Sequence, residues 1–457
     1  MWKKPIFPSC LVAALLVWTA SLAFAAGTLE LKGTTRWSGE VQVKQQVLVT
    51  QGAVLQIAPG TIVRIAAADL KISVMGEIQV AGTAQQPVVF AAPKGWQGIE
   101  MAEPSGPSSF DYAEFKGAEA AISSLAARFT VRHCKFVDGE WGVRLLRESF
   151  PVIEDSLFEG NALGVDNEMK SGATLRRNLF RGQTKSAVLA SHNSKGLIEK
   201  NRFEKNAQGI TLLQRYEDRI VGNTLVDNQI GIYCNQTQNT PTITGNTFEG
   251  NETALVNFSF SYPAVENNTF TNNKSAVHND QFGSPLLRRN LLRGNGTAIF
   301  NNRKSNPVVE ENLIEGNQRA IFCDYSSYPQ VRRNNFQGNP LGVELGIYQS
   351  ADWEKRSGSK RIVQKEAAAR KSQNPLLAQA PTEFKDVVDV SGNWWGKDTP
   401  SLVAAGAEGN LPLFFDRHDK AKVVYEGFGP DSYVLDTVRF APWLESPVAG
   451  AGPGKQP

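Results

Sequence analysis

Large apolar residues recur along the chain at intervals of 21 to 23 residues, and from Phe203 onward each stands inside the pattern Asn-x-Φ-x-x-Asn, where Φ is the apolar residue. The stretches NTFEGN at 246–251 and NTFTNN at 268–273 are two examples. The Φ positions are Phe136, Phe158, Phe180, Phe203, Leu225, Phe248, Phe270, Leu292, Ile314 and Phe336, with Phe115 one step earlier. A period this regular indicates a solenoid, in which each repeat packs mainly on its neighbours.

Within each repeat, apolar and polar residues alternate in short runs, which is the pattern of β-strands. Two further apolar columns accompany Φ. The column five residues before Φ contains Val131, Ile153, Leu175, Ile198, Ile220, Ile243, Val265, Leu287, Val309 and Val331. The column seven residues after Φ contains Val143, Val165, Ile210, Ile232, Leu255, Val277, Ile299, Ile321 and Val343. Leucine-rich repeats have a similar length but need L-x-x-L-x-L and a helical half-repeat, which this chain lacks. Three short strands per coil predict an all-β, single-stranded parallel β-helix.

Asparagines form two columns, one two residues before Φ and one three residues after it. Asn tolerates the left-handed backbone of sharp corners, and its amide can bond to the coils above and below. We therefore interpret these columns as structural Asn ladders. Cys234 and Cys323 share a column four coils apart, roughly 19 Å at strand spacing, which is too far for a disulfide. Cys134 lies in another column, so we expect all three thiols to be reduced and buried.

The N-terminus predicts export. Lys3 and Lys4 precede an apolar run that ends in Ala23-Phe24-Ala25, so residues 1–25 are predicted to be a signal peptide, and we expect no membrane span after its cleavage. The expected location is the periplasm, the cell surface or the medium. The net charge of +3 does not favour a nucleic-acid partner, and we expect a monomer.

The repeats resemble the right-handed parallel β-helix proteins of the pectin-lyase-like superfamily, nearest to exported NosD-type and carbohydrate-binding-and-hydrolase β-helices. The opening run VLVTQGAVLQIAPGTIVRI is similar to first coils of such proteins, and SGNWWGKDTP (391–400) and VRFAPWLESP (438–447) are similar to their last coil. The predicted organisation is a cap with the first coils at 26–110, regular repeats at 111–345, an insertion with a short helix at 346–385, a last coil and cap at 386–447, and a flexible tail at 448–457. The helix is expected within RIVQKEAAARK (361–371).

Familiar catalytic sets of β-helix enzymes are missing from the sequence. It contains no Asp-Asp pair and no Gly-His-Gly, and Asp416-Arg417-His418-Asp419 only superficially resembles the D-P-H-D signature of alginate epimerases, so we interpret it as a polar turn in an end-cap. The four histidines lie in different columns, so no metal site and no cofactor are expected. Paired charges before Φ alternate in sign from coil to coil, which predicts ion pairs between coils.

The column eight residues after Φ should point outward, yet in the later coils it contains Tyr233, Val256, His278, Phe300 and Phe322. We call these five residues the outer column. With the nearby loop residues, the candidate ligand-binding residues are Tyr233, Phe300, Phe322, Tyr325, Tyr328 and Tyr262. Three kinds of molecule or segment could cover this apolar surface: the 346–385 insertion of the same chain, a sugar, or a partner protein.

The sequence therefore favours an exported, non-catalytic scaffold or binding module that contacts polysaccharide or cell-envelope partners through an aromatic face. The alternative is a polysaccharide-modifying enzyme, such as a lyase, epimerase or hydrolase, with an unfamiliar active site.

Overall fold

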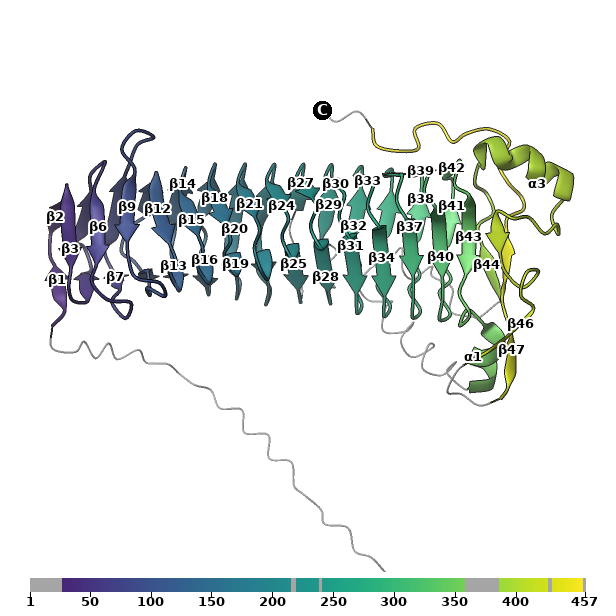
Figure 1. Cartoon of the computed structure of the whole chain (residues 1–457), viewed down its shortest axis with the longest axis horizontal. Helices are drawn as coiled ribbons and strands as arrows, with labels where there is room; N and C mark the ends of the chain where they lie inside the picture. Colours follow the sequence, from purple (N-terminus) through teal and green to yellow (C-terminus); the bar gives the residue numbers. More distant parts are fainter. Residues whose placement is uncertain (1–26, 215–218, 238–240, 358–385, 426–429, 455–457) are drawn as a thin grey trace, which may run out of the picture.

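A computed structural model describes residues 27–214, 219–237, 241–357, 386–425 and 430–454. The chain winds into an elongated solenoid whose coils succeed one another from the N-terminal to the C-terminal end (Figure 1). Each regular coil contributes one strand to each of three parallel sheets, here named sheets A, B and C. The solenoid has about 14 turns of roughly 22 residues, which confirms the predicted parallel β-helix. The predicted signal peptide lies outside the described residues.

Sheet A is the longest sheet, with 16 strands in the described residues. Its strands are β1 (Leu29–Leu31), β4 (Val47–Val49), β7 (Ile72–Val74), β10 (Ile99–Ala102), β13 (Ala120–Leu125), β16 (Trp141–Leu146), β19 (Leu163–Asn167), β22 (Ser186–Ala190), β25 (Gln208–Leu213), β28 (Ile230–Asn235), β31 (Thr253–Phe258), β34 (Ser275–Asp280), β37 (Thr297–Asn301), β40 (Arg319–Cys323), β43 (Leu341–Leu345) and β45 (Phe414–Phe415). Its strands reach six residues, so this sheet offers the widest outer face.

Sheets B and C each have 14 short strands. Sheet B consists of β2 (Thr34–Trp37), β5 (Val54–Ile57), β8 (Glu77–Ala81), β11 (Ser108–Asp111), β14 (Phe129–Arg132), β17 (Val152–Glu154), β20 (Gly172–Arg176), β23 (Lys195–Glu199), β26 (Arg219–Val221), β29 (Thr242–Thr244), β32 (Ala264–Glu266), β35 (Leu286–Arg288), β38 (Val308–Glu310) and β41 (Gln330–Arg332). Sheet C consists of β3 (Glu40–Val43), β6 (Ile62–Ile65), β9 (Val88–Ala91), β12 (Ala113–Lys116), β15 (Lys135–Val137), β18 (Leu157–Glu159), β21 (Leu179–Arg181), β24 (Arg202–Glu204), β27 (Thr224–Val226), β30 (Thr247–Glu249), β33 (Thr269–Thr271), β36 (Leu291–Arg293), β39 (Leu313–Glu315) and β42 (Asn335–Gln337).

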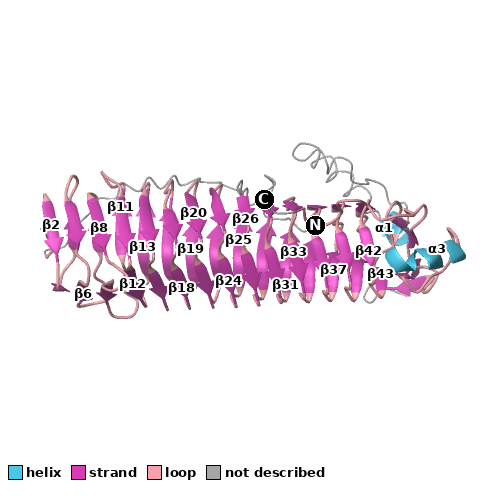
Figure 2. Ribbon diagram, turned by 90° about the horizontal axis from the view of Figure 1, so that it is seen from above, coloured by secondary structure: helices cyan, strands magenta, loops and turns pink. Residues whose placement is uncertain are grey.

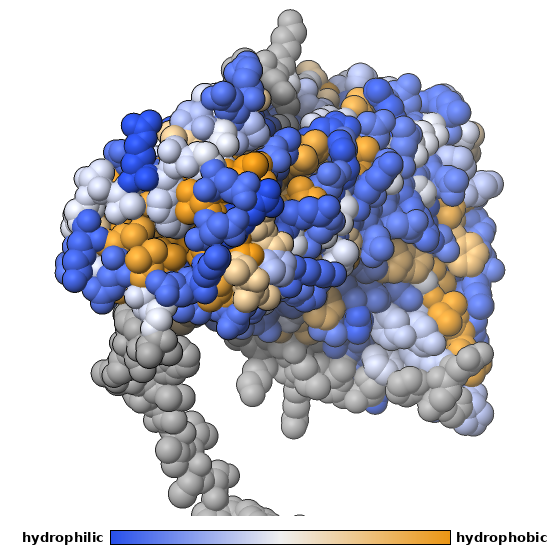
Figure 3. Space-filling view, turned by 60° about the vertical axis from the view of Figure 1, so that its left-hand side comes forward, coloured by the Kyte–Doolittle hydropathy of each residue, from blue (hydrophilic) through white to orange (hydrophobic). Residues whose placement is uncertain are grey.

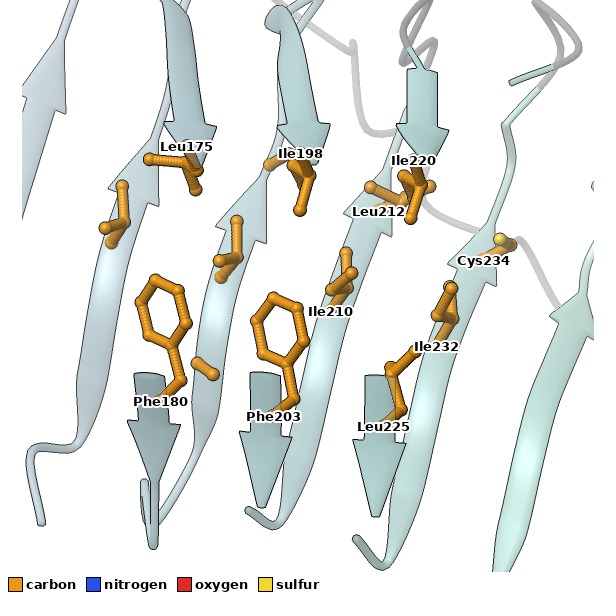
Figure 4. Packing of buried hydrophobic residues seen from close by; sticks show 14 of the residues in the cluster. Leu175, Phe180, Ile198, Phe203, Ile210, Leu212, Ile220, Leu225, Ile232 and Cys234 are labelled. Atoms are coloured by element: carbon orange, nitrogen blue, oxygen red, sulfur yellow. The ribbon is translucent and has the colours of Figure 1, made fainter. Parts of the chain in front are cut away.

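The core is a set of stacked columns, one from each sheet. Phe248 pairs with Phe270 in sheet C, and their rings stack with centroids 4.5 Å apart. In the coils drawn in Figure 4, the Φ column, represented by Phe180 and Phe203, faces the sheet B column and the sheet A column across a buried interior. Cys134, Cys234 and Cys323 are free and buried, as predicted, and burial raises the pKa of the Cys134 and Cys323 thiols to about 12.

The asparagine columns form continuous ladders. The backbone N–H of Asn246 donates to Oδ1 of Asn268 at 2.9 Å, and its side-chain amide donates to the same oxygen at 3.0 Å. The ladder ends on Asn393, which accepts the backbone N–H of Asn334 at 2.8 Å and so places the NWW segment on the last coil. The left-handed residue is not the ladder asparagine but the residue before it, for example Arg177 with φ 55°. The amides therefore satisfy buried backbone, while their neighbours make the corner.

The predicted pairing of charges between coils is also present. Arg177 forms two hydrogen bonds with Asp155 in the preceding coil, at 2.8 and 2.7 Å, and Arg289 contacts Glu311 in the following coil at 2.9 Å. Such exposed pairs contribute little free energy each, so they serve mainly to avoid repulsion between stacked like charges.

The C-terminal end is capped by helices and short strands (Figures 1 and 2). The cap consists of α1 (Ala351–Ser357), β44 (Val387–Asp389), the 3-10 helix η2 (Gly396–Asp398), α3 (Thr399–Ala405), β46 (Lys422–Val424), β47 (Ser432–Val434) and β48 (Thr437–Arg439). The helix of the predicted insertion begins at Ala351; the expected 361–371 helix lies outside the described residues. The sequence did not predict α3. Two residues of the expected flexible tail are bonded to the solenoid. The backbone N–H of Val448 donates to Asn335 Oδ1 at 2.8 Å, and that of Gly452 donates to the Glu311 carbonyl at 2.8 Å.

Candidate functional site

The outer column lies on the outer face of sheet A, as the sequence predicted. Its members pair in register from β28 to β40, and each is half-buried, between fully buried neighbours along its strand. The rings of His278 and Phe300 stack with centroids 4.5 Å apart, and those of Phe300 and Phe322 with centroids 4.7 Å apart. The Arg319 guanidinium lies over the Phe322 ring, 4.5 Å from its centroid, and forms an ion pair with Glu344. The stack is therefore closed at this end by a cation held in place by a carboxylate.

This stacking decides which part of each ring is free. Neighbouring rings face one another along the solenoid axis at interplanar angles of 27° and 23°. Their faces are used within the stack, so their edges form the outward surface. A parallel stack runs through the adjacent loops, where Phe260 lies 4.9 Å from Phe282 between ring centroids. From His278 to Phe322, the outer column is therefore a ridge of ring edges rather than a row of open ring faces.

The six candidate residues from the sequence divide into two groups. Tyr233, Phe300 and Phe322 are half-buried on the outer face, and Tyr325 is 38% exposed and stacks on Tyr348. Tyr262 and Tyr328 are only 4% and 5% exposed. The Tyr328 hydroxyl donates a hydrogen bond to Asp436 in the C-terminal cap at 2.8 Å. The expectation that these two tyrosines belong to the exposed surface is therefore corrected: both side chains are buried, and Tyr328 anchors the cap.

Charged groups frame the outer column on the loop side. Arg303 donates from Nε to Asp280 Oδ1 at 2.6 Å, and its other nitrogen pairs with Oδ2. Burial lowers the pKa of His278, which keeps its imidazole neutral and suited to the stack. Burial also raises the pKa of Asp324 to about 6, and this carboxyl accepts the backbone N–H groups of Tyr325 and Tyr348. Residues 358–385 of the insertion lie outside the described ranges. The expectation that the 346–385 insertion covers the outer column therefore stays a prediction.

A second cluster on sheet A was not found from the sequence. In the coils from β16 to β19, the outward column contains Arg144 and then Asp166. The Trp141 indole N–H donates to Asp166 Oδ2 at 3.1 Å, and the Arg144 guanidinium lies over the Trp141 ring, 4.6 Å from its centroid. We call Trp141, Arg144, Asp166 and the nearby Glu168 the Asp166 cluster. Asp166 is only 3% exposed, although strand alternation predicts an outward, solvated side chain.

The electrostatics of the Asp166 cluster are unusual for an outer face. Burial raises the pKa of Asp166 to about 7, and the neighbouring Glu168 carboxyl adds to this rise. The indole hydrogen bond and Arg144 act in the opposite direction but do not cancel it. A carboxyl group that titrates near neutrality in a partly enclosed position is typical of functional sites, although structural networks produce the same effect.

The Asp416–His418 motif lies in the C-terminal cap, beside a pocket of about 220 Å³ that both residues help to line. Asp416 Oδ1 accepts the backbone N–H of His418 at 2.7 Å and lies 2.9 Å from its Nδ1, while Oδ2 accepts the N–H of Val438 at 2.7 Å. The bonds to His418 fix the turn, and the bond from Val438 joins it to β48. The arrangement supports the interpretation as a polar end-cap turn.

Metal-binding residues do not converge in the part of the chain that the structure describes. Within it, no group of three or more His, Cys, Asp or Glu side chains could hold a metal ion. Copper prefers imidazole, thiolate and thioether ligands. Here the three thiols are buried apart from one another, and Met101 is buried while Met169 is exposed. Among the described residues, the donor set does not fit a copper centre.

The face of the molecule seen in Figure 3 is mixed in hydropathy. Figure 3, which brings the N-terminal coils forward, shows hydrophobic patches in orange separated by hydrophilic residues in blue. Among the described residues, no helix is both long and apolar enough to span a membrane.

Comparisons with known proteins give one family match and two distant structural likenesses. The family described as "Periplasmic copper-binding protein (NosD)" matches residues 105–259 and 242–367. Among solved structures, the chain is similar to the periplasmic alginate epimerase AlgG at 10% identity and a TM-score of 0.31, over 70% of this chain and 85% of that one. It is also similar to a mannuronic-acid-specific family 6 polysaccharide lyase from human gut microbiota, at 11% identity and a TM-score of 0.26, over 73% and 88% of the two chains.

A search of curated proteins found no match. The two structural likenesses are distant, and they carry no conclusion about activity. The NosD match is different, because its two segments together span residues 105–367, which is more than half of the chain and includes the regular coils from sheet A strand β13 to β43. On this evidence, the chain belongs to the periplasmic NosD family of β-helix proteins.

Proposed function

We propose that this periplasmic β-helix is a non-catalytic scaffold that binds a protein of the cell envelope through the outer column. The carrying observation is the ridge of stacked ring edges formed by His278, Phe300 and Phe322 on an outer sheet face. An outward apolar column of this kind is the surface that a solvated strand face avoids. Aromatic side chains are enriched in the cores of protein interfaces.

The geometry favours a protein over a sugar at this surface. A pyranose ring stacks on the face of an aromatic ring, but here the faces are engaged with one another and, at Phe322, with Arg319. Ring edges and the apolar side chain of Val256 instead suit the irregular apolar side chains of a protein partner. The flanking ion pair between Arg303 and Asp280 provides a polar rim, as interfaces usually have around their apolar centre.

Affinity capture tests this proposal. The mature chain, starting at residue 26, is tagged and incubated with envelope protein extract of its source cells, and bound proteins are quantified by mass spectrometry. The wild-type chain should capture a specific partner. The double variant Phe300→Ala/Phe322→Ala should bind that partner at least tenfold more weakly, which corresponds to about 1.4 kcal/mol of binding free energy.

The matched control is Leu157→Ala/Leu179→Ala, which removes two outward apolar residues from sheet C. The control should retain the partner. Equal capture by all three proteins would contradict a role for the outer column.

The enzymatic alternative has one supporting observation, the adjacent carboxyl groups of Asp166 and Glu168 with the raised pKa of Asp166. A carboxyl group with a raised pKa beside a second carboxyl group is a usual arrangement in polysaccharide hydrolysis. Incubation with polysaccharides, followed by detection of reducing ends and of unsaturated uronate absorbance, tests it. Product that disappears in Asp166→Asn would favour the enzyme over the scaffold.

A further inference from the structure

The two ends of the solenoid differ in how far the chain covers them. At the C-terminal end, Trp394 forms a β-bridge with Asn335 of sheet C, and Trp395 stacks on Phe336 with ring centroids 4.4 Å apart. At the N-terminal end, β1, β2 and β3 are the last strands of sheets A, B and C, and each pairs only with the strand of the following coil. Figure 1 shows this first coil at the opposite end of the solenoid from the cap. Within the described ranges, no strand pairs with its free side.

The first coil leaves part of the apolar core open. Its inward residue Leu29 pairs in register with Val47, and its inward residue Val41 pairs with Val63. Val47 and Val63 are 2% and 0% exposed, whereas Leu29 is 42% exposed and Val41 is half-buried. The same inward positions are fully buried one coil later, because a coil packs on each side of them. The N-terminal end is therefore an incompletely covered cross-section of the core.

The three edge strands lack the features that usually prevent strand pairing. Their sequences, LEL, TTRW and EVQV, contain no proline. Their charged residues, Glu30, Arg36 and Glu40, alternate with the inward residues and so point outward rather than toward the core. Exposed edges without proline or inward charges readily accept a further strand.

The shape of this end restricts what can cover it. A single strand of another protein would pair with one edge and leave the other two edges and the apolar centre open. A second solenoid end has the same three edges around an apolar centre, so it can cover all of them at once. The C-terminal end of this chain is already occupied by its own cap. The matching surface is therefore the N-terminal end of a second copy.

The charges of this edge are complementary to themselves. Two identical ends that meet head to head are related by a two-fold axis perpendicular to the solenoid, so the facing strands are antiparallel. With this axis through sheet A, β2 of each copy faces β3 of the other. One register that keeps outward residues opposite outward residues places Arg36 opposite Glu40 of the second copy, and Thr35 opposite Val41. The Arg36 guanidinium has no ion pair among the described residues, and Glu40 is held by Arg64 at 2.7 Å. By symmetry, the contact between Arg36 and Glu40 occurs twice.

We propose that two copies of this chain pair head to head through β1, β2 and β3, which joins each of the three sheets across the contact. The pairing buries Leu29 and Val41 and gives the free edges their hydrogen-bond partners. The outer column, in β28 to β40, lies in the far half of each copy, so the dimer presents it twice. The pairing does not rest on the proposed function, because it needs no partner protein.

Sedimentation equilibrium of the mature chain, starting at residue 26 and tagged only at its C-terminus, tests the proposal. The wild-type protein should sediment with twice the mass of one chain. A monomer at all chain concentrations up to about 100 μM, which is the state that the sequence led us to expect, would overturn the proposal.

Two charge reversals then locate the contact. Arg36→Glu and Glu40→Arg should each weaken self-association at least tenfold, because each places like charges opposite one another twice. An equimolar mixture of the two variants should associate again, since opposite charges meet at both contacts of the mixed pair. This recovery would also show that both variants fold. A dimer that neither reversal weakens, or a mixture that associates as weakly as its components, would contradict the proposed contact.

The matched control is Arg219→Glu, which reverses an exposed charge in the same outward column of sheet B but in a middle coil. It should associate as the wild type does, and equal weakening by Arg36→Glu and Arg219→Glu would contradict a contact at the first coil. Hydrogen exchange gives an independent measurement. The amides of β1, β2 and β3 should exchange more slowly in the wild type than in Arg36→Glu, and equal exchange in the two proteins would overturn the proposal.

Discussion

The inside and the outside of sheet A differ in how they change along the solenoid. On the inside, Val165 in β19 and Val277 in β34 occupy the same column and are both fully buried. On the outside, the residues next to them are Asp166 and His278, one in a polar cluster and the other in a ring stack. Neighbouring positions of one strand therefore follow different rules. The interior repeats because every coil must fit the next one, whereas the exterior is free to diverge.

The comparison also separates stability from binding. Side chains of the interior columns pack against the coils before and after them, so a change there is felt by three coils. Outward side chains lose fewer contacts when they are shortened. Substitutions inside should therefore change the free energy of unfolding, and substitutions outside should change ligand or partner affinity.

The largest loss is expected when an Asn ladder is broken. Asn268→Leu removes the acceptor of the buried Asn246 backbone N–H and the donor to the Ile243 and Glu266 carbonyls, whereas the Asn246 side-chain amide keeps its bonds to the Ile220 and Thr244 carbonyls. At about 1–3 kcal/mol for each unsatisfied group, we expect a loss of about 5 kcal/mol in the free energy of unfolding. Urea unfolding followed by circular dichroism measures it. The control is Thr269→Ala, at the outward position next to Asn268, which should change the free energy of unfolding by less than about 0.5 kcal/mol. Similar losses in both variants would contradict the difference between inward and outward positions.

A smaller but still large loss is expected for the Φ column. Phe270→Ala leaves a cavity beneath a stacked ring and should cost about 4 kcal/mol. Phe300→Ala removes a ring of the same size from the outer column and should cost about 2 kcal/mol, since the ring takes part in two aromatic pairs of about 1 kcal/mol each. The two urea transitions can be compared directly. Equal losses would mean that Phe300 is part of the core.

The Asp166 cluster makes a pH-dependent contribution to the free energy of unfolding. Asp166 has a pKa of about 7 in the folded protein, above the value of about 3.9 of an unfolded chain, so the folded state binds more protons between these values. Stability should therefore fall as pH rises from about 4 to about 7, and Asp166→Asn should remove that fall. About three pKa units correspond to at most about 4 kcal/mol, and relaxation near Glu168 and Arg144 reduces the measured part. Parallel pH profiles of wild type and Asp166→Asn would contradict the raised pKa.

The sequence predicted the interior well because period and burial are linked in a solenoid. Phe248, Phe270 and the asparagines around them could be placed from their spacing alone, since each coil repeats the same constraint. The Asp166 cluster could not be placed, because Asp166 occupies an outward position and its burial comes from Trp141 and Arg144 lying over it. Tyr328 was placed wrongly on the surface for a similar reason, since its partner Asp436 comes from a distant cap segment.

Photocrosslinking at one column of sheet A tests the central claim most directly. A benzoylphenylalanine residue is introduced at Phe300 or, as the matched position in the first half of the same outward column, at Leu189, and cells are irradiated before the protein is purified. The account predicts a discrete crosslinked protein partner from position 300 and none from position 189. The same partner at both positions, or none at position 300, would contradict the assignment of protein binding to the ring-bearing half of the outer face.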